Sequence, residues 1–279
     1  MGRVTDRRRV LRVRDGRVDE RPDTLTVEEP LEIRVAGRRL TVTMRTPGDD
    51  FALACGFLVA EGVVAAAGEV SRVVYCGGRD RTDPEAENSY NVVDVALAPG
   101  VAPPADSLER RVTTTSACGI CGRTELDAVR TGARYPLASG PRVDPHLLGS
   151  LPDRLRGAQR IFERTGGLHA AGLFAGDGTL IDVREDVGRH NAVDKVVGRA
   201  LQAGRLPLDG TVLMVSGRAS FELVQKAVMA GIPVLAAVSA PSSLAVDLAR
   251  ETGLTLIGFL RGGSMNIYAG AERVVLPAG

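Results

Sequence analysis

The feature that most constrains the fold is the alternation of short apolar segments with amphipathic segments in the last third of the chain. Apolar runs at 211–215, 233–238 and 254–260 are separated by two segments with helical periodicity, 219–230 and 242–251. Short apolar strands joined through helices form a parallel sheet that is covered by those helices. The pattern therefore predicts an α/β fold with a mostly parallel sheet.

The same unit extends toward the N-terminus. Two strands, 170–175 and 179–184, are predicted to form a hairpin around a Gly-Asp-Gly turn, and a helix is predicted over 187–203. Before the hairpin, a stripe of apolar residues predicts another helix, which ends at Gly166. Its apolar positions are Leu151, Leu155, Ala158, Ile161 and Phe162.

The first hundred residues are predicted to be mostly strands. Alternation over 9–14 is typical of a half-exposed strand that ends at Asp15-Gly16, and segments 31–36 and 39–44 predict a hairpin. One apolar helix is expected over 51–61. Further strands are expected at 70–76, 89–97 and 108–114.

With 279 residues, the chain is long enough for about two domains. We expect a strand-rich N-terminal domain over 1–115 and an α/β domain over 146–279. A double-cysteine loop and a linker rich in glycine and proline, 116–145, connect them.

Composition excludes several classes of protein. The net charge of +1 argues against a dedicated nucleic-acid surface. No apolar run reaches the roughly 18 residues needed to span a bilayer. The first 16 residues are too charged for a secretory signal. We therefore expect a cytoplasmic protein without a membrane partner, in which thiols stay reduced.

Three polar turns follow the predicted parallel strands and are expected to meet at one edge of the sheet. They are Ser216-Gly217-Arg218, the segment 239–243, and Arg261-Gly262-Gly263-Ser264. Ligands of open α/β sheets bind at this edge, and arginine suits phosphate. Because Walker and G-x-G-x-x-G motifs are absent, we expect a phosphate-bearing ligand other than an ordinary nucleoside triphosphate or dinucleotide.

Asp186, His190 and Asp194 are spaced four apart at the start of the predicted helix 187–203. One interpretation is a solvated or inter-domain polar face. The other is a wall of the ligand edge, with Asp186 orienting His190. His169 precedes a strand and is positioned to face the same cleft, whereas His146 is expected to be exposed in a loop.

Cys118 and Cys121 form the pair in Ser-Ala-Cys-Gly-Ile-Cys-Gly. A zinc site needs three or four ligands, and the chain has no second Cys-x-x-Cys and no H-x-E with P-C-x-x-C, so no metal is expected. Cys55 lies in the apolar helix and is interpreted as a buried structural thiol, and Cys76 is given no role. A disulfide oxidoreductase and a sulfur carrier both stay open. Arginines near the pair favour the thiolate that either reaction needs.

Several separated motifs, in order, resemble the formate dehydrogenase accessory sulfurtransferases of the FdhD type. The resemblance covers nearly the whole chain. The motifs are EEPLEIRV (28–35), RTPGDDFALACGFLVAEGVV (45–64), TTSACGICGR (114–123), TGGLHAAGLF (165–174), REDVGRHNAVDKVVG (184–198), SGRASFELVQKA (216–227) and GFLRGGSMNIY (258–268).

The resemblance implies that the protein takes sulfur from a cysteine desulfurase and transfers it to the molybdenum cofactor in its bis(molybdopterin guanine dinucleotide) form. The sulfurated cofactor would then serve formate dehydrogenase. Cys118 would carry the persulfide and Cys121 would assist. The cofactor-binding stretch of the family falls on Phe259, Leu260, Arg261, Gly262, Gly263 and Ser264.

The resemblance also implies a cytidine deaminase-like three-layer core without its zinc, and a homodimer. We add Ser216, Gly217 and Arg218 to the expected cofactor site because their turn belongs to the same edge of the sheet. Two other functions fit the residues less fully. One is a cofactor-binding chaperone that transfers no sulfur, and the other is a disulfide oxidoreductase.

Overall fold

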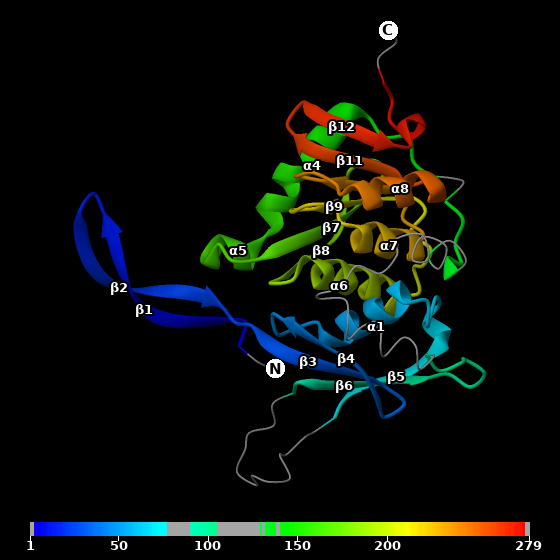
Figure 1. Cartoon of the computed structure of the whole chain (residues 1–279), viewed down its shortest axis with the longest axis horizontal. Coiled ribbons are helices and arrows are strands. Elements are labelled where there is room, and N and C mark those ends of the chain that lie inside the picture. The colour runs from blue at the N-terminus through cyan, green and yellow to red at the C-terminus, as the bar shows by residue number, and fades with distance from the viewer. Residues whose placement is uncertain (1–2, 77–89, 105–128, 130–131, 138–139, 277–279) are drawn as a thin grey trace.

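The computed structural model describes residues 3–76, 90–104, 129, 132–137 and 140–276. Its strands form three sheets, of six, four and two strands. The two larger sheets and their helices make one body, from which the two-stranded sheet extends as an arm (Figure 1). The predicted strand 108–114, the cysteine pair and most of the linker lie outside the described residues.

The six-stranded sheet belongs to the C-terminal half and has the order β12-β11-β10-β9-β7-β8. Its strands are β7 (His169–Ala175), β8 (Leu180–Asp186), β9 (Thr211–Val215), β10 (Val234–Ala237), β11 (Thr255–Arg261) and β12 (Ser264–Ala269). β10 is parallel to β9 and β11, but the β11–β12, β7–β8 and β7–β9 pairs are antiparallel. The prediction of a mostly parallel sheet is therefore wrong. Hairpin strand β7 inserts between β8 and β9, and the unpredicted strand β12 returns beside β11.

Helices cover both faces of this sheet and give three layers. They are α4 (Pro145–Ala158) on one face and α6 (Arg189–Gln202), α7 (Phe221–Met229) and α8 (Ser243–Thr252) on the other. Alternate residues of β9 enter separate hydrophobic clusters: Val212 and Met214 pack with α4, whereas Leu213 and Val215 pack with the other three helices. This alternation is what a strand buried on both faces requires.

The four-stranded sheet belongs to the N-terminal half and has the order β4-β3-β6-β5. The strands are β3 (Glu29–Val35), β4 (Arg38–Arg45), β5 (Val70–Tyr75) and β6 (Val92–Leu97), with a 3₁₀ turn, η1 (Ala67–Glu69), before β5. Helix α1 (Asp50–Ala60) follows β4. The predicted hairpin, helix and strands of this region are confirmed.

Two glycines allow α1 and α6 to touch through their backbones. A Cβ atom on Gly56 would lie 1.9 Å from the Asp194 carbonyl oxygen, and one on Gly198 would lie 1.8 Å from that of Ala52. Leu31 and Val193, from the two halves of the chain, belong to one continuous hydrophobic cluster. The two large sheets are therefore joined by a shared core.

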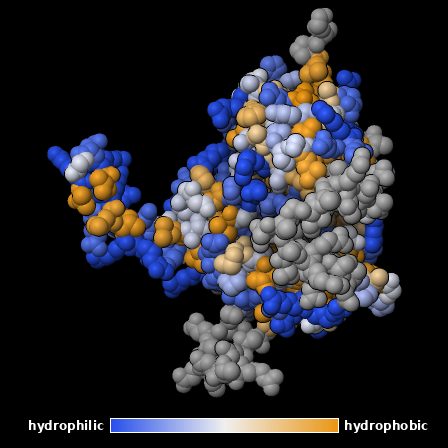
Figure 2. Space-filling view, viewed as in Figure 1, coloured by the Kyte–Doolittle hydropathy of each residue, from blue (hydrophilic) through white to orange (hydrophobic). Residues whose placement is uncertain are grey.

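The arm consists of β1 (Thr5–Arg14) and β2 (Arg17–Thr26), as predicted for its first strand. Asp15 and Gly16 make its turn with φ values of 51° and 75°, which favours a tight hairpin. Apolar side chains are exposed along the arm, and Figure 2 shows them as a stripe. At its base the Thr26 hydroxyl donates to the Thr165 hydroxyl at 3.0 Å.

The helix predicted to end at Gly166 is divided in two. α4 ends at Ala158, and α5 (Arg160–Thr165) continues after a break at Gln159. Gly166 ends α5 with φ 68°, as predicted.

A second 3₁₀ turn, η2 (Ala271–Arg273), follows β12. Within the described ranges, the helices are all too short or too polar to cross a membrane.

Candidate functional site

The carboxyl ends of β9, β10 and β11 lie side by side at one edge of the six-stranded sheet. The Ser239 N–H donates to the Gly217 carbonyl at 3.3 Å, and the Phe259 N–H donates to the Ser239 carbonyl at 3.2 Å. Each turn is thus bonded to the next. The predicted meeting of the three turns at one edge is confirmed.

A cavity of about 570 Å³ opens at this edge, lined by the strand ends and by α4 and α5. This is within the size range of small-molecule sites. The sheet contributes Ser216, Val238, Leu260 and Arg261 to its lining. Three of the predicted cofactor-binding residues, Ser216, Leu260 and Arg261, therefore line one cavity.

The other predicted cofactor-binding residues do not line the cavity. Gly217 and Arg218 follow Ser216 in its turn, and Gly262, Gly263 and Ser264 form the exposed turn and first residue of β12. Phe259 lies in a β-bulge with φ 52° and is 48% exposed. An aromatic residue in left-handed backbone is rare, and such strain often occurs at functional sites.

Helix α4 holds the Gly262-Gly263 turn in place. A Cβ atom on Gly149 would lie 2.0 Å from the Gly262 carbonyl oxygen, so the helix backbone contacts the turn directly. Gly262 itself has φ 55°, a conformation that favours glycine. The position of the arginine turn thus depends on glycine in both elements.

Positive charge flanks the cavity on both sides. Arg261 is exposed at the end of β11, and Arg156 is exposed on α4, where its guanidinium lies 3.8 Å from the centre of the Phe162 ring. Two guanidinium groups near an open cavity suit a ligand that carries phosphate.

His169 begins β7 and lines the cavity, as its position in the sequence predicted. Burial lowers the pKa of His169, and the charge of Arg189 lowers it further. The imidazole therefore favours its neutral form near pH 7. The Ser216 hydroxyl accepts a hydrogen bond from the Ala170 N–H at 2.9 Å, which fixes the turn beside this histidine.

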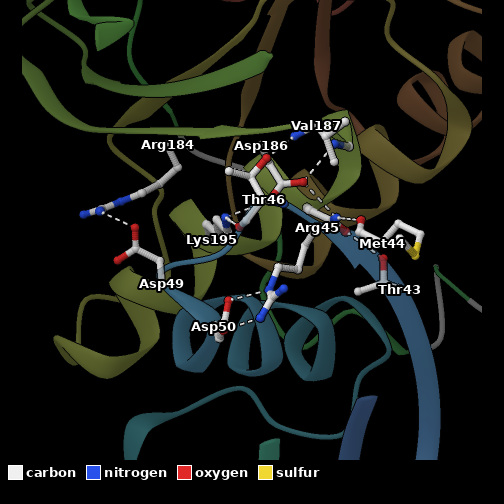
Figure 3. A network of polar contacts seen from close by, with 12 residues as sticks. Thr43, Met44, Arg45, Thr46, Asp49, Asp50, Arg184, Asp186, Val187 and Lys195 are labelled. Atoms are coloured by element: carbon white, nitrogen blue, oxygen red, sulfur yellow. Dashed lines mark hydrogen bonds and ion pairs between the residues drawn. The ribbon is translucent and has the colours of Figure 1, made fainter. Parts of the chain in front are cut away.

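Asp186 is fully buried and belongs to a structural network (Figure 3). Its carboxylate lies 2.7 Å from Lys195 Nζ and accepts hydrogen bonds from the Thr46 N–H at 3.1 Å and from Asn191 Nδ2 at 3.0 Å. The hypothesis that Asp186 orients His190 is therefore wrong. Asp186 instead ties β8 and α6 to the segment after β4.

The same network includes two further ion pairs (Figure 3). Arg45 holds Asp50 through two bonds of 3.0 Å, and both side chains are buried. Arg184 of β8 bonds Asp49 at 3.0 Å. The Arg184–Asp49 pair thus connects the two halves of the molecule, whereas Arg45 and Asp50 both belong to the N-terminal half.

Asp194 and His190 have separate partners. Buried Asp194 accepts from Lys226 Nζ at 2.7 and 2.9 Å. His190 Nε2 lies 2.7 Å from Glu222 Oε2 and 3.2 Å from Ser220 Oγ. The hydrogen bond from His190 lowers the pKa of Glu222. Asp186 and Asp194 are thus interior pairs, and His190 forms a partly exposed pair with α7.

The two thiols inside the described ranges differ in exposure. Cys55 is 1% exposed, and burial raises its pKa to about 11, so it is a neutral structural thiol as predicted. Cys76 follows β5 and is half-buried. Cys118 and Cys121 lie outside the described residues. Among the residues whose positions are given, no group of three His, Cys, Asp or Glu side chains is arranged to hold a metal.

Sequence reasoning missed the α4–α5 side of the cavity. Asp153, Arg156 and Gln159 line it, and none of them belongs to a motif. His146, predicted in a loop, lies in the first turn of α4 and is exposed. The apolar stripe indicated which face of α4 packs on the sheet, but gave no sign that its polar residues border a cavity.

The fold is that of an α/β protein with a cavity at its strand ends, and the comparisons identify its family. The model of the FdhD/NarQ family matches residues 26–275. A Streptomyces coelicolor protein named sulfur carrier protein FdhD is 69% identical, over 100% of this chain and 98% of its own. A Mycobacterium tuberculosis protein of the same name is 58% identical, over 98% of this chain and 100% of its own.

The chain belongs to the FdhD/NarQ family. A crystal structure of a proposed formate dehydrogenase accessory protein from Desulfotalea psychrophila has the same fold, with a TM-score of 0.75. It is 23% identical and covers 98% of this chain and 100% of its own. The resemblance found in the sequence motifs is therefore confirmed at the level of the family.

Proposed function

We propose that this protein is a sulfurtransferase that takes sulfur from a cysteine desulfurase and transfers it to the molybdenum cofactor used by formate dehydrogenase. The observation that carries the proposal is 69% identity, over the whole chain, to a protein named sulfur carrier protein. The chain also has the cysteine pair, Cys118 and Cys121, that a persulfide carrier needs. We place this activity in the cytoplasm, where thiols stay reduced.

Sulfur loading is an exchange of one S–S bond for another. The Cys118 thiolate attacks the terminal sulfur of the desulfurase persulfide, and the donor cysteine leaves as a thiolate. Cys118 then carries the sulfur as a persulfide. The exchange needs no added oxidant or reductant.

Delivery at the sulfide level needs two electrons. Cys121 supplies them when its thiolate attacks Cys118 Sγ: the terminal sulfur leaves as HS⁻ and a Cys118–Cys121 disulfide forms. A cellular dithiol then reduces that disulfide. Cys121 is thus assigned the assisting role.

We assign the cofactor, in its bis(molybdopterin guanine dinucleotide) form, to the edge that includes the cavity. Arg261 and Arg156 there suit its phosphates. The residues assigned to the substrate are Phe259, Leu260, Arg261, Gly262, Gly263 and Ser264, with Ser216, Gly217 and Arg218. We propose a homodimer as the active form.

Mass spectrometry tests the carrier assignment. After incubation with a cysteine desulfurase and cysteine, the peptide that contains Cys118 should gain one sulfur atom. Cys118→Ala should abolish the gain, and Cys55→Ala, which removes a buried thiol, should leave it unchanged. A sulfur adduct that survives Cys118→Ala contradicts the assignment.

Two measurements separate the alternatives. A cofactor-binding chaperone would still support formate dehydrogenase activity with both Cys118 and Cys121 changed to alanine. A disulfide oxidoreductase would reduce or oxidise generic disulfides rapidly. The sulfur carrier should do neither.

A further inference from the structure

The arm formed by β1 and β2 has two chemically different faces. Residues opposite each other on the two strands point to the same face, and successive residues of a strand alternate between faces. One face carries charged residues opposite each other, such as Arg12 and Asp19. The other carries Leu11, Val13 and Val18, which are 73%, 69% and 64% exposed. The arm therefore has one polar face and one apolar face that is open to solvent.

The arm is attached to its own body at its base, where the Thr26 hydroxyl donates to the Thr165 hydroxyl at 3.0 Å. Toward its turn it extends away from the body (Figure 1), and Figure 2 shows its apolar side chains uncovered. A two-stranded hairpin is at best marginally stable in water unless a further strand or a packed apolar face supports it. The apolar face of the arm is thus a surface for another polypeptide to cover.

The four-stranded sheet also has an apolar face open to solvent. Its inner face packs on α1, and Leu31 and Ile33 are buried there. On its outer face, Val42 and Met44 of β4 are 41% and 47% exposed, and Pro30, opposite Met44, is exposed as well. In Figure 1 the described helices all lie on the other side of this sheet. The outer face is therefore a second apolar surface on the same chain.

The arm and the four-stranded sheet carry opposite charges. Residues 3–26 contain eight arginines and five acidic residues, a net charge of +3. The described residues of the sheet and its helix, 27–76 and 90–104, contain five arginines and eight acidic residues, a net charge of −3. Arg9 on the apolar face of the arm has an 81% exposed side chain, and Glu28 at the start of β3 is exposed. Opposite charges around two apolar surfaces favour their association.

Two copies of the chain can use both surfaces at once. A stable interface takes about 20–30 residues on each side, more than the apolar face of one arm provides. When each copy gives its arm to the sheet of the other, both surfaces are used twice, and the two-fold symmetry closes the assembly at two chains. Because the arm extends away from its own sheet, the sheet that it reaches in this arrangement belongs to the second copy.

We propose that two copies of this chain exchange arms. The face of the arm with Leu11, Val13 and Val18 packs on the outer face of the partner copy's four-stranded sheet, at the positions of Val42 and Met44. This inference rests on the homodimer named in the proposed function, and it deepens that function by naming the two surfaces that meet. The basic arm then lies against the acidic half of the second copy.

Size-exclusion chromatography with light scattering of the full-length protein tests the proposal. The wild type should have twice the chain mass of 29.4 kDa. Leu11→Asp and Met44→Asp should each weaken dimerisation by about tenfold or more, because an unpaired carboxylate is costly to bury. Leu180→Asp is the matched control, since Leu180 is 40% exposed on β8, outside both surfaces, and it should leave the dimer unchanged.

Mixing the two weakened variants tests which surfaces meet. A mixed dimer has one intact contact, between the arm of Met44→Asp and the sheet of Leu11→Asp. The mixture should therefore form dimers more tightly than either variant alone, as captured through an affinity tag on one of them. Dimers that ignore Met44→Asp, or a mixture that gains nothing, would overturn the exchange. Equal unfolding midpoints of the variants and the wild type exclude misfolding as the cause.

The outcomes separate this proposal from the rest of the proposed function. A wild type with the mass of one chain removes both the homodimer and the exchange of arms, and the arm then binds a different protein. A dimer that ignores both substitutions removes the exchange and keeps the homodimer. Failure of sulfur loading on Cys118 in a wild type whose dimer depends on both surfaces removes the carrier assignment and supports the exchange.

Discussion

Burial decides which single thiols are available for chemistry. Cys55 is 1% exposed, contacts Gln202 at 3.9 Å, and has a pKa raised by burial to about 11. Alkylation requires the thiolate, and at pH 8 a thiol of this pKa is ionised to about one part in a thousand. We therefore expect iodoacetamide to leave Cys55 unmodified in the folded protein at pH 8, whereas the half-buried Cys76 reacts.

Peptide mapping after alkylation checks this result. All four cysteines should react in 8 M urea, which is the control for accessibility. The rate at Cys55 should rise with pH up to about 11, because the thiolate fraction rises. Labelling of Cys55 as fast as Cys76 in the native protein would contradict its structural role.

The charged residues show why sequence spacing placed some side chains wrongly. The i, i+4 spacing of Asp186, His190 and Asp194 predicted a common face, but each is held by a different partner. Lys195 and Lys226 hold the two aspartates inside the molecule. Lys226 is distant along the chain and is brought close only by the packing of α7 on α6, so the pairing could not be predicted from the sequence.

At the scale of helices and strands, glycine contacts set the distance between α4 and the arginine turn. Gly149→Ala would place a Cβ atom 2.0 Å from the Gly262 carbonyl oxygen. Overpacking of this kind typically costs about 1–3 kcal/mol. We expect the variant to lose about that much free energy of unfolding and to bind GDP more weakly, because the turn that begins with Arg261 is displaced.

Gly157→Ala is the matched control in the same helix. A Cβ atom there meets nothing within 4 Å, so alanine should stabilise the helix by up to about 1 kcal/mol. Urea unfolding gives the free energy of unfolding of each variant, and calorimetric titration gives its affinity for GDP. Equal stability and equal GDP affinity of both variants would show that α4 does not position the turn.

Most elements followed from periodicity in the sequence, and the exceptions have long-range causes. Strands β9, β10 and β11 and the helices between them were predicted because their apolar patterns are local. The break at Gln159 was not, because it depends on the Glu185 carboxylate holding the start of α5 from β8. β12 was missed because its preceding glycines were interpreted as a ligand turn rather than a hairpin. Because this break was not predicted, the polar residues of α4 that line the cavity were not identified from the sequence either.

At the scale of the whole molecule, a buried ion pair of the C-terminal half lies against helix α1 of the N-terminal half. Lys226 of α7 holds Asp194 of α6, and its ammonium lies 5.9 Å from the centre of the Phe57 ring of α1. The side chains of the pair are 9% and 3% exposed. Removing one partner of such a pair leaves a buried charge, and typically costs about 3–5 kcal/mol. Lys226→Met should therefore lower the free energy of unfolding by about that amount.

Replacing both partners tests whether the unpaired buried charge of Asp194 causes the loss of stability in Lys226→Met. In the double variant Lys226→Met, Asp194→Leu, apolar side chains fill the same space, so most of the lost stability should return. Arg8→Met, which breaks the exposed Arg8–Asp6 pair on the arm, should leave the unfolding midpoint unchanged. Urea denaturation of the four proteins provides the comparison. If the double variant is less stable than Lys226→Met alone, the pair stabilises the joint between α6 and α7 by its own attraction, and the argument from an unpaired buried charge is wrong.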